Sequence, residues 1–231
     1  MAVIIAEKIT RIYQDHGVPV TALKDVDLQI DAGEFVAIVS PSGSGKSTLL
    51  NILGGLDRPT SGQVLIEGKD ITRMKSTDLI DLRLHRIGFV FQAYNLIPVL
   101  TAKENVEFIM LLQKKPHGER SSRAEELLQA VGLNELMDRR PTELSGGQQQ
   151  RVAVARALAS FPAFVLADEP TANLDSESAG NLLDIMEQLN REKGMTFIFS
   201  THDSRVVARA RRVITLQDGK IISDQLTLKK Q

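Results

Sequence analysis

The amino-acid sequence predicts an α/β fold in which an antiparallel β segment precedes a core of mostly parallel strands. Residues 26–30 alternate apolar and polar side chains, as a half-buried strand does, whereas 35–39 and 164–167 are apolar throughout, as central parallel strands are. Between Gln92 and about Ser160 the strand pattern gives way to helical periodicity. These observations predict a helical segment inserted in an α/β core.

Short runs rich in β-branched or aromatic residues predict further strands at 3–9, 64–67, 87–91, 163–167, 196–200 and 213–216. In the helical segment, apolar residues between 124 and 131 have the i, i+3, i+4, i+7 spacing of one buried helix face. Residues 146–159 have a similar spacing after Ser145, a favourable N-cap residue. The polar stretch 114–122, which contains a proline and a glycine, predicts a loop.

Composition excludes several functional classes. The 231 residues include no cysteine, which excludes Cys-ligated zinc, iron–sulfur clusters and thiol catalysis and fits a reducing compartment. Lys and Arg total 28 against 29 Asp and Glu, so the basic field of a nucleic-acid-binding domain is not expected. Residues 1–8 lack the basic start of a signal peptide, and no run approaches the roughly 18 apolar residues of a membrane span. We therefore expect a cytosolic chain with no export signal, membrane span or nucleic-acid partner.

A phosphate-binding pattern follows the strand 35–39, and it consists of Ser40, Pro41, Ser42, Gly43, Ser44, Gly45, Lys46, Ser47 and Thr48. Such a loop directs backbone N–H groups and a helix N-terminus at the β- and γ-phosphates of a nucleotide. Lys46 adds a positive charge, and the Ser47 hydroxyl is a ligand for Mg²⁺. Ser40 replaces the usual first glycine and could strain the loop. The alternative is an ordinary Gly/Ser turn, which the flanking strand and helix disfavour.

Two acidic residues, Asp168 and Glu169, end the apolar run 164–167. The carboxyl ends of parallel strands form the edge at which open α/β sheets bind ligands. Asp168 then suits the surroundings of Mg²⁺, and Glu169 suits the activation of an attacking water. A strand that enters a turn through Asp-Glu is the alternative, but the phosphate-binding pattern favours the catalytic role.

Gln92 and His202 also follow predicted strands and should reach the same edge of the sheet. The amide could contact Mg²⁺ or water, and the imidazole could donate a hydrogen bond to the γ-phosphate. Each has an ordinary alternative, because a loop glutamine is usually solvated and Thr201 or Asp203 can cap the next helix.

The pentapeptide Leu144, Ser145, Gly146, Gly147 and Gln148 begins the predicted helix 146–159. A helix N-terminus attracts anions, and glycines allow phosphate to approach the backbone. The chain therefore has a second phosphate site although one loop already serves one nucleotide. This site is either a helix cap or a site for a nucleotide held by another chain, and a cap alone does not account for the whole pentapeptide.

With these motifs in this order and spacing, the chain closely resembles the ATP-binding subunit of ATP-binding-cassette (ABC) transporters over essentially its whole length. The resemblance identifies 40–48 as the Walker A loop, Gln92 as the Q-loop and 144–148 as the signature. It identifies 164–169 as the Walker B strand, 173–175 as the D-loop and His202 as the switch histidine. It implies a P-loop NTPase (RecA-like) core with an N-terminal antiparallel β-subdomain and an inserted α-helical subdomain. Residues 1–231 would form one ABC-type ATP-binding domain, with 1–92 and 160–231 as its nucleotide-binding α/β core and 93–159 as its helical signature subdomain.

The resemblance also implies a Mg²⁺-dependent ATPase and assigns its residues. The catalytic set would be Glu169, His202, Gln92 and Lys46, and the Mg²⁺ set Ser47, Gln92 and Asp168. Tyr13 would stack on adenine, although it could simply be a tyrosine at a strand edge. In the family two subunits face head to tail, so that Ser145, Gly146, Gly147 and Gln148 would contact the partner's ATP and Asp175 would bridge the two sites.

Within the family, NILGGLDRPTSG (51–62), GFVFQAYNLIP (88–98) and LADEPTANLD (166–175) resemble the ATPases of lipoprotein release, macrolide export and antimicrobial-peptide export, with Ala172 in place of a usual glycine. Few residues follow Gly219, where many sugar importers have a regulatory domain, and this favours an export-type or mechanotransmission partner. We expect an ATP-dependent homodimer on the inner face of the cell membrane, held there by integral membrane permease subunits, with or without a periplasmic partner.

In such families a groove after the Q-loop receives a coupling helix of the permease. Apolar side chains that could line this groove, or instead pack inside the helical segment, are Phe91, Tyr94, Leu96, Ile97, Val99 and Leu100. Two other functions remain open: a regulatory ABC ATPase that signals through a membrane partner without transport, and a soluble ABC ATPase with no role in transport.

Overall fold

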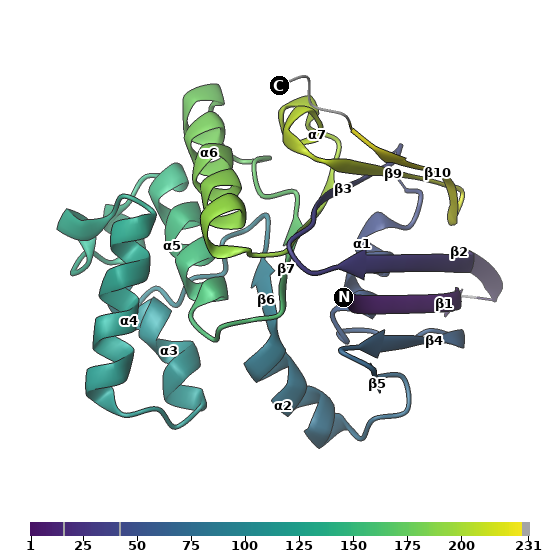
Figure 1. The fold of residues 1–231 in the computed structure, drawn as a ribbon, viewed down its shortest axis with the longest axis horizontal. Coiled ribbons are helices and arrows are strands. Elements are labelled where there is room, and N and C mark those ends of the chain that lie inside the picture. Colours follow the sequence, from purple (N-terminus) through teal and green to yellow (C-terminus); the bar gives the residue numbers. More distant parts are fainter. Residues whose placement is uncertain (16, 42, 228–231) are drawn as a thin grey trace.

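The computed structural model describes residues 1–15, 17–41 and 43–227, which form two β-sheets with α-helices around them (Figure 1). An antiparallel sheet, in the order β2-β1-β4-β5, contains β1 (Ala2–Asp15), β2 (Val18–Asp31), β4 (Ser61–Ile66) and β5 (Lys69–Asp70). A larger sheet, in the order β10-β9-β3-β8-β7-β6, contains β3 (Phe35–Val39), β6 (Ile87–Val90), β7 (Phe164–Asp168), β8 (Phe197–Thr201), β9 (Arg212–Gln217) and β10 (Lys220–Leu226). Its strands pair in parallel, except that β10 is antiparallel to β9.

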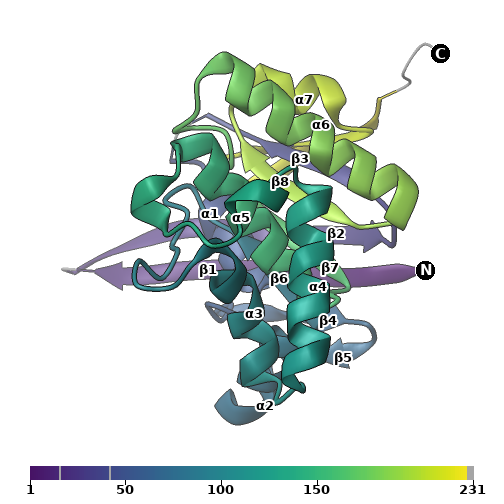
Figure 2. The same cartoon turned by 90° about the vertical axis from the view of Figure 1, so that its left-hand side faces the viewer.

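The helices occupy separate parts of the molecule. Helix α1 (Lys46–Leu53) follows β3, and α2 (Ser76–Arg86) leads into β6. Between β6 and β7 come α3 (Ala102–Leu112), α4 (His117–Ala130) and α5 (Gly146–Leu158), with two short 3-10 helices at Asn134–Leu136 and Pro141–Glu143. Figure 2 shows α3, α4 and α5 together in front of the strands. Helices α6 (Ser176–Lys193) and α7 (Ser204–Arg209) follow β7 and β8.

Strand β3 separates two hydrophobic cores. Phe35 faces a core shared with the helices α3 to α6, whereas Val36 and Ile38 face a core that also contains α1 and the antiparallel sheet. All three side chains are at most 1% exposed. The continuous apolar run in the sequence follows from this burial on both faces. Helix α1 contacts β1 and β2 on one side and β7 and β8 on the other, so its position is fixed by both sheets.

The predicted fold class is confirmed: an antiparallel β segment, a parallel core and helices between β6 and β7. The predicted loop 114–122 is wrong over most of its length, because α4 begins at His117. Pro116 precedes that helix with φ −58°, a value that proline imposes and that suits a helix start rather than its interior. The sequence pattern also missed β5 and β10, whose side chains are mostly exposed or half-buried.

No helix of the chain, over the residues that the structure describes, combines the length and the apolar character needed to cross a membrane.

Candidate functional site

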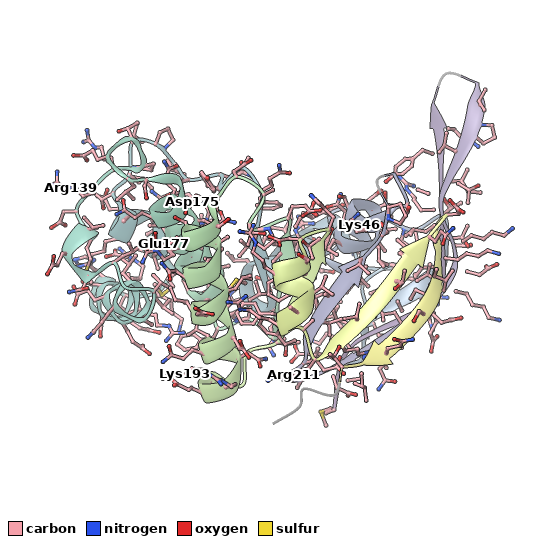
Figure 3. All side chains as sticks on the ribbon, turned by 90° about the horizontal axis from the view of Figure 1, so that it is seen from above. Lys46, Arg139, Asp175, Glu177, Lys193 and Arg211 are labelled. Carbon is pink, nitrogen blue, oxygen red and sulfur yellow. The ribbon has the colours of Figure 1, made fainter. Side chains whose placement is uncertain are left out.

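A cavity of about 760 Å³ lies at the carboxyl ends of β3, β7 and β8. Eleven of the predicted site residues line it: Ser40, Gly43, Ser44, Gly45, Lys46, Ser47, Thr48, Gln92, Asp168, Glu169 and His202. Figure 3 shows Lys46 between the hairpin of β1 and β2 and the start of α6. The order β3-β8-β7 brings the end of β3, and so the phosphate-binding pattern, to the same sheet edge as Asp168 and His202, although these segments are far apart in sequence.

The loop between β3 and α1 depends on a glycine at its close approach to β2. Gly45, which precedes α1, has φ 92°, and a Cβ atom there would lie 2.3 Å from the carbonyl oxygen of Ala22. Only glycine combines this backbone conformation with that contact. The first turn of α1, which begins at Lys46, leaves N–H groups without partners in the helix, and such groups attract anions.

Ser40 contacts the Lys46 ammonium directly. Lys46 Nζ donates to the Ser40 carbonyl oxygen and to Ser40 Oγ, both at 3.0 Å, and Ser40 Oγ donates to the Pro41 carbonyl oxygen at 2.9 Å. The backbone of Ser40 does not adopt a positive φ, so its side chain introduces no strain of that kind. Pro41 lines a neighbouring hollow beside His202 instead of the main cavity, and Ser42 lies outside the described residues.

The two acidic residues have different partners on β8. Asp168 Oδ1 accepts a 2.8 Å hydrogen bond from the Ser200 hydroxyl, its neighbour across the parallel pair. Glu169 Oε1 lies 2.7 Å from His202 Nδ1, and Oε2 accepts a 3.1 Å bond from the Thr201 hydroxyl. The Glu169 side chain is 16% exposed and that of His202 is 74% exposed. The imidazole therefore sits at the mouth of the cavity and can turn towards a ligand, whereas the carboxylate is fixed inside.

Asp203 caps the helix that follows β8, as one alternative for this segment predicted, and His202 nevertheless lines the cavity. Asp203 caps α7 by accepting from the Arg205 N–H at 2.8 Å, and it also accepts from the Thr171 hydroxyl at 2.6 Å. Burial opposes its ionisation, but hydrogen bonds from Arg205 and Thr171 outweigh it and lower the pKa of Asp203 to about 2. The segment after β7 is thereby tied to the segment that carries His202.

The pentapeptide 144–148 lies outside the cavity. Ser145 caps α5, accepting from the Gln148 N–H at 3.3 Å, while Gln148 Oε1 accepts from the Ser145 N–H at 2.8 Å. Both glycines have a packing reason that the sequence did not reveal. A Cβ atom on Gly146 would lie 2.7 Å from the Tyr94 hydroxyl, and one on Gly147 would lie 2.9 Å from Cβ of Ser178 on α6.

Neither Tyr13 nor Asp175 is among the residues that line this cavity. The strand register pairs Tyr13 with Val20, which does line it. Asp175 caps α6 and accepts from the N–H groups of Glu177 and Ser178. A hydrogen bond with the Ser178 side chain, together with these N–H groups, lowers the pKa of the Asp175 carboxyl. Figure 3 shows Asp175 and Lys46 towards the same side of the molecule, away from Lys193 and Arg211.

Four lining residues were missed by sequence reasoning: Val20, Thr21, Ala22 and Ser200. The first three lie on β2, opposite the phosphate loop, and nothing in their residue types indicated this. Ser200 could have been suspected from its place two residues before His202 at the end of an apolar strand.

The donor set in the cavity suits a hard cation. A hydroxyl on Ser47, an amide on Gln92 and a carboxylate on Asp168 all line it, and oxygen ligands of these kinds are those that Mg²⁺ prefers. The Ser200 hydroxyl donates to Asp168 Oδ1 and so holds this carboxylate in place at the cavity.

Comparison with known proteins agrees with this geometry. The family model described as "ABC transporter" matches residues 23–172. The lipoprotein-releasing system ATP-binding protein LolD 1 of Rhodopseudomonas palustris is 50% identical over 89% of this chain and 92% of its own length. The macrolide export ATP-binding/permease protein MacB of Mannheimia succiniciproducens is 47% identical over 97% of this chain, which spans only 35% of that larger protein.

A solved structure has the same fold. The ATP-binding cassette MJ0796, in a dimeric post-hydrolysis state bound to ADP and Pi, superposes with a TM-score of 0.89 at 43% identity, over 96% of this chain and 98% of that one.

Proposed function

We propose, from the premise that this chain belongs to the ABC transporter family, that it hydrolyses ATP to power a membrane permease. The observation that carries the proposal is the meeting of Lys46, Glu169 and His202 in one cavity, while Ser145 lies outside it. Because the signature residues 144–148 lie outside the cavity of their own chain, the cavity would form a complete ATP site only together with the signature of a second subunit that faces it head to tail. The dimeric cassette of similar fold supports this arrangement.

The chemistry follows from the positions of the charged groups. The phosphate loop and Lys46 would bind the β- and γ-phosphates, and Ser145 of the partner subunit would approach the γ-phosphate from the opposite side. Glu169 would orient and activate the attacking water, and His202 would donate to the γ-phosphate after turning from its contact with Glu169. Catalysis would then consist of positioning and electrostatic stabilisation.

Mg²⁺ would be held by Ser47, Gln92 and Asp168, and when bound it would neutralise charge on the phosphate oxygens. Gln92 is exposed at the end of β6, and its carbonyl oxygen accepts a 3.0 Å bond from Asn173 Nδ2. The Q-loop and the D-loop are therefore in direct contact on the side where the partner subunit would lie.

The permease would dock in a groove of about 410 Å³ beside the Q-loop. Phe91 and Ile97, two of the six apolar residues predicted to line it, are joined there by Phe89 from β6, Phe108 from α3 and Ala157 from α5. Tyr94 and Leu96 instead line a separate hollow, and Val99 is 71% exposed. Docking in this groove would hold the subunit on the inner face of the membrane, and the lipoprotein-release and macrolide-export relatives favour an export or extraction function.

Replacing Glu169 by glutamine tests the proposal. The amide keeps the size of the side chain but cannot take a proton, so we expect ATP turnover to fall about 10²- to 10⁴-fold while ATP binding persists. The nucleotide should then trap the closed dimer, which gel filtration with ATP would detect. The matched control is Glu192→Gln on the exposed end of α6, which should leave both turnover and oligomeric state unchanged. Undiminished turnover in Glu169→Gln would reject the catalytic role of Glu169.

A further inference from the structure

Tyr13 belongs to a closed cluster of three side chains from two separate segments. Its hydroxyl donates a 2.8 Å hydrogen bond to Asp57 Oδ2. The Arg11 guanidinium lies over the Tyr13 ring, with Cζ 4.4 Å from the ring centroid. Arg11 Nη2 also lies 3.0 Å from Asp57 Oδ1. Each member therefore contacts the other two.

The cluster is partly withdrawn from water. The side chains of Arg11 and Asp57 are 25% and 24% exposed. Cation–π and charged hydrogen-bond contacts are stronger in such surroundings than on a fully exposed surface. The orientation of the Tyr13 ring is therefore set by its neighbours more than by its own rotamer preference.

Asp57 connects this cluster to the helix that begins at the phosphate loop. The Asp57 N–H donates to the Asn51 carbonyl oxygen, in the last part of α1, at 3.1 Å. Helix α1 starts at Lys46, whereas Arg11 and Tyr13 lie on β1. The contact with Asp57 thus fixes the Tyr13 ring relative to the body that holds the phosphate loop.

The Tyr13 side chain lies on the face of the hairpin that borders the cavity. Residues directly opposite in an antiparallel pair point to the same face, and Tyr13 is opposite Val20, which lines the cavity. Arg11 covers one face of the ring, and among the described residues no aromatic ring stacks on Tyr13. Neither Arg11 nor Asp57 lines the cavity itself.

We propose that Arg11 and Asp57 are positioning residues that hold the Tyr13 ring at a set distance and angle from the phosphate loop. A nucleobase then stacks on the face of Tyr13 that Arg11 does not cover, while the phosphates occupy the cavity. A ring already oriented for stacking loses less conformational freedom when the base binds. The cluster therefore contributes to the affinity for the nucleoside part of ATP and not to the affinity for its phosphates. The proposal rests on the proposed function, in which the cavity binds ATP.

The test compares two ligands that differ in the nucleoside. MgATP engages both the phosphate loop and Tyr13, whereas magnesium tripolyphosphate engages only the phosphate loop. We expect Asp57→Ala to weaken MgATP binding about 3- to 10-fold, the effect of one lost hydrogen bond, and to leave tripolyphosphate binding unchanged. Tyr13→Phe should weaken MgATP binding to a similar extent. The double variant should be no weaker than the weaker single variant, because both changes remove the same hydrogen bond.

Conservative variants and a spectroscopic signal separate positioning from general stability. Asp57→Asn keeps an acceptor for the hydroxyl and should recover most of the MgATP affinity. The chain has no tryptophan and two tyrosines, so in a Tyr94→Phe background Tyr13 is the only strong fluorophore. MgATP should change its emission and tripolyphosphate should not. Asp57→Ala in that background should reduce the change at saturating MgATP.

The outcomes are distinct. Equal weakening for both ligands would indicate a general structural defect and overturn the proposal, as would unchanged MgATP affinity in both Asp57→Ala and Tyr13→Phe. If Asp57→Ala does not fold, Tyr13→Phe and Arg11→Lys provide the same comparison. A wild-type chain that binds neither ligand would contradict the proposed function instead.

Discussion

Ser40 gives the Lys46 ammonium an acceptor that a glycine at this position would lack. An ammonium has three N–H donors, and the carbonyl oxygen and hydroxyl of Ser40 already accept two of them. One donor remains for the β- and γ-phosphates together. The Ser40 hydroxyl therefore competes with a phosphate oxygen for Lys46, unless it rotates away when the nucleotide binds.

We expect Ser40→Ala to bind MgATP more tightly, by about 2- to 10-fold, because Lys46 would exchange no hydroxyl contact for the phosphate and the net gain is that of about one hydrogen bond. Isothermal titration calorimetry would measure the change, and Ser40→Thr, which keeps a hydroxyl, is the matched control. A weaker Ser40→Ala complex would show instead that the hydroxyl assists binding.

Some side chains of the site can be predicted from the sequence, whereas their contacts with distant residues cannot. The side chains of Lys46, Glu169 and His202 could be predicted because each follows a recognisable strand at the carboxyl edge of a parallel sheet. The contact between Tyr13 and Asp57 could not, because it joins residues 44 apart and depends on how the hairpin lies against α1. The glycines of the signature suggested phosphate binding, but the structure shows that Gly147 is also needed for packing against α6.

Helix α7 begins at a carboxylate that also contacts the segment after β7. Asp203 caps it and connects it to Thr171 through a bond that crosses from β8 to β7. Because hydrogen bonds to the ionised form lower the pKa of Asp203 from an ordinary value of about 4 to about 2, they stabilise the folded state when the carboxylate is charged. This stabilisation is complete above about pH 4 and is lost as the pH falls towards 2.

We predict that Asp203→Asn lowers the free energy of unfolding by about 1 to 2 kcal/mol at pH 7, and that its difference from wild type shrinks between pH 4 and pH 2. Urea unfolding at several pH values would measure this. Asp184→Asn, which removes a 65% exposed partner of Arg209, should cost little at any pH. A difference that is independent of pH would contradict the electrostatic origin.

Secondary-structure elements were predicted best where both faces are buried. Strands β3, β7 and β8, whose side chains are almost all buried, lie within two residues of their predicted positions at either end. Strand β10 was missed because it is an edge strand with mostly exposed side chains, and its sequence lacks a buried pattern. The start of α4 differs from the prediction because a proline is compatible both with a loop and with the position before a first helical turn, and Pro116 has the second role.

On the scale of the whole molecule, the groove beside the Q-loop brings together α3, α5 and β6. Arg156 of α5 lines it and donates to the carbonyl oxygens of Tyr94 and Asn95. Burial lowers the pKa of the Arg156 guanidinium. A permease helix that moved in this groove would therefore act, through Arg156, on the loop that follows Gln92, and so would connect the proposed docking groove to the cavity.

We predict that Ile97→Asp reduces the amount of this chain retained on washed membranes that contain its permease, by at least 10-fold, because the carboxylate would be desolvated in the docked state. Ile222→Asp, on an exposed part of β10, is the control and should be retained like wild type. Both variants should keep the wild-type unfolding midpoint within a few degrees. Normal retention of Ile97→Asp would remove the groove as the docking site.

The order of the strands also fixes the distance between the ends of β3 and β7. Between the end of β3 and the end of β7 lies β8 alone, so the two backbones are separated by two interstrand spacings, or about 10 Å. That width is a property of hydrogen-bonded sheets and does not depend on the 122 sequence positions from Lys46 to Asp168. A change in the length of the helical region would therefore leave unchanged the width of the gap in which we propose that the phosphate reacts.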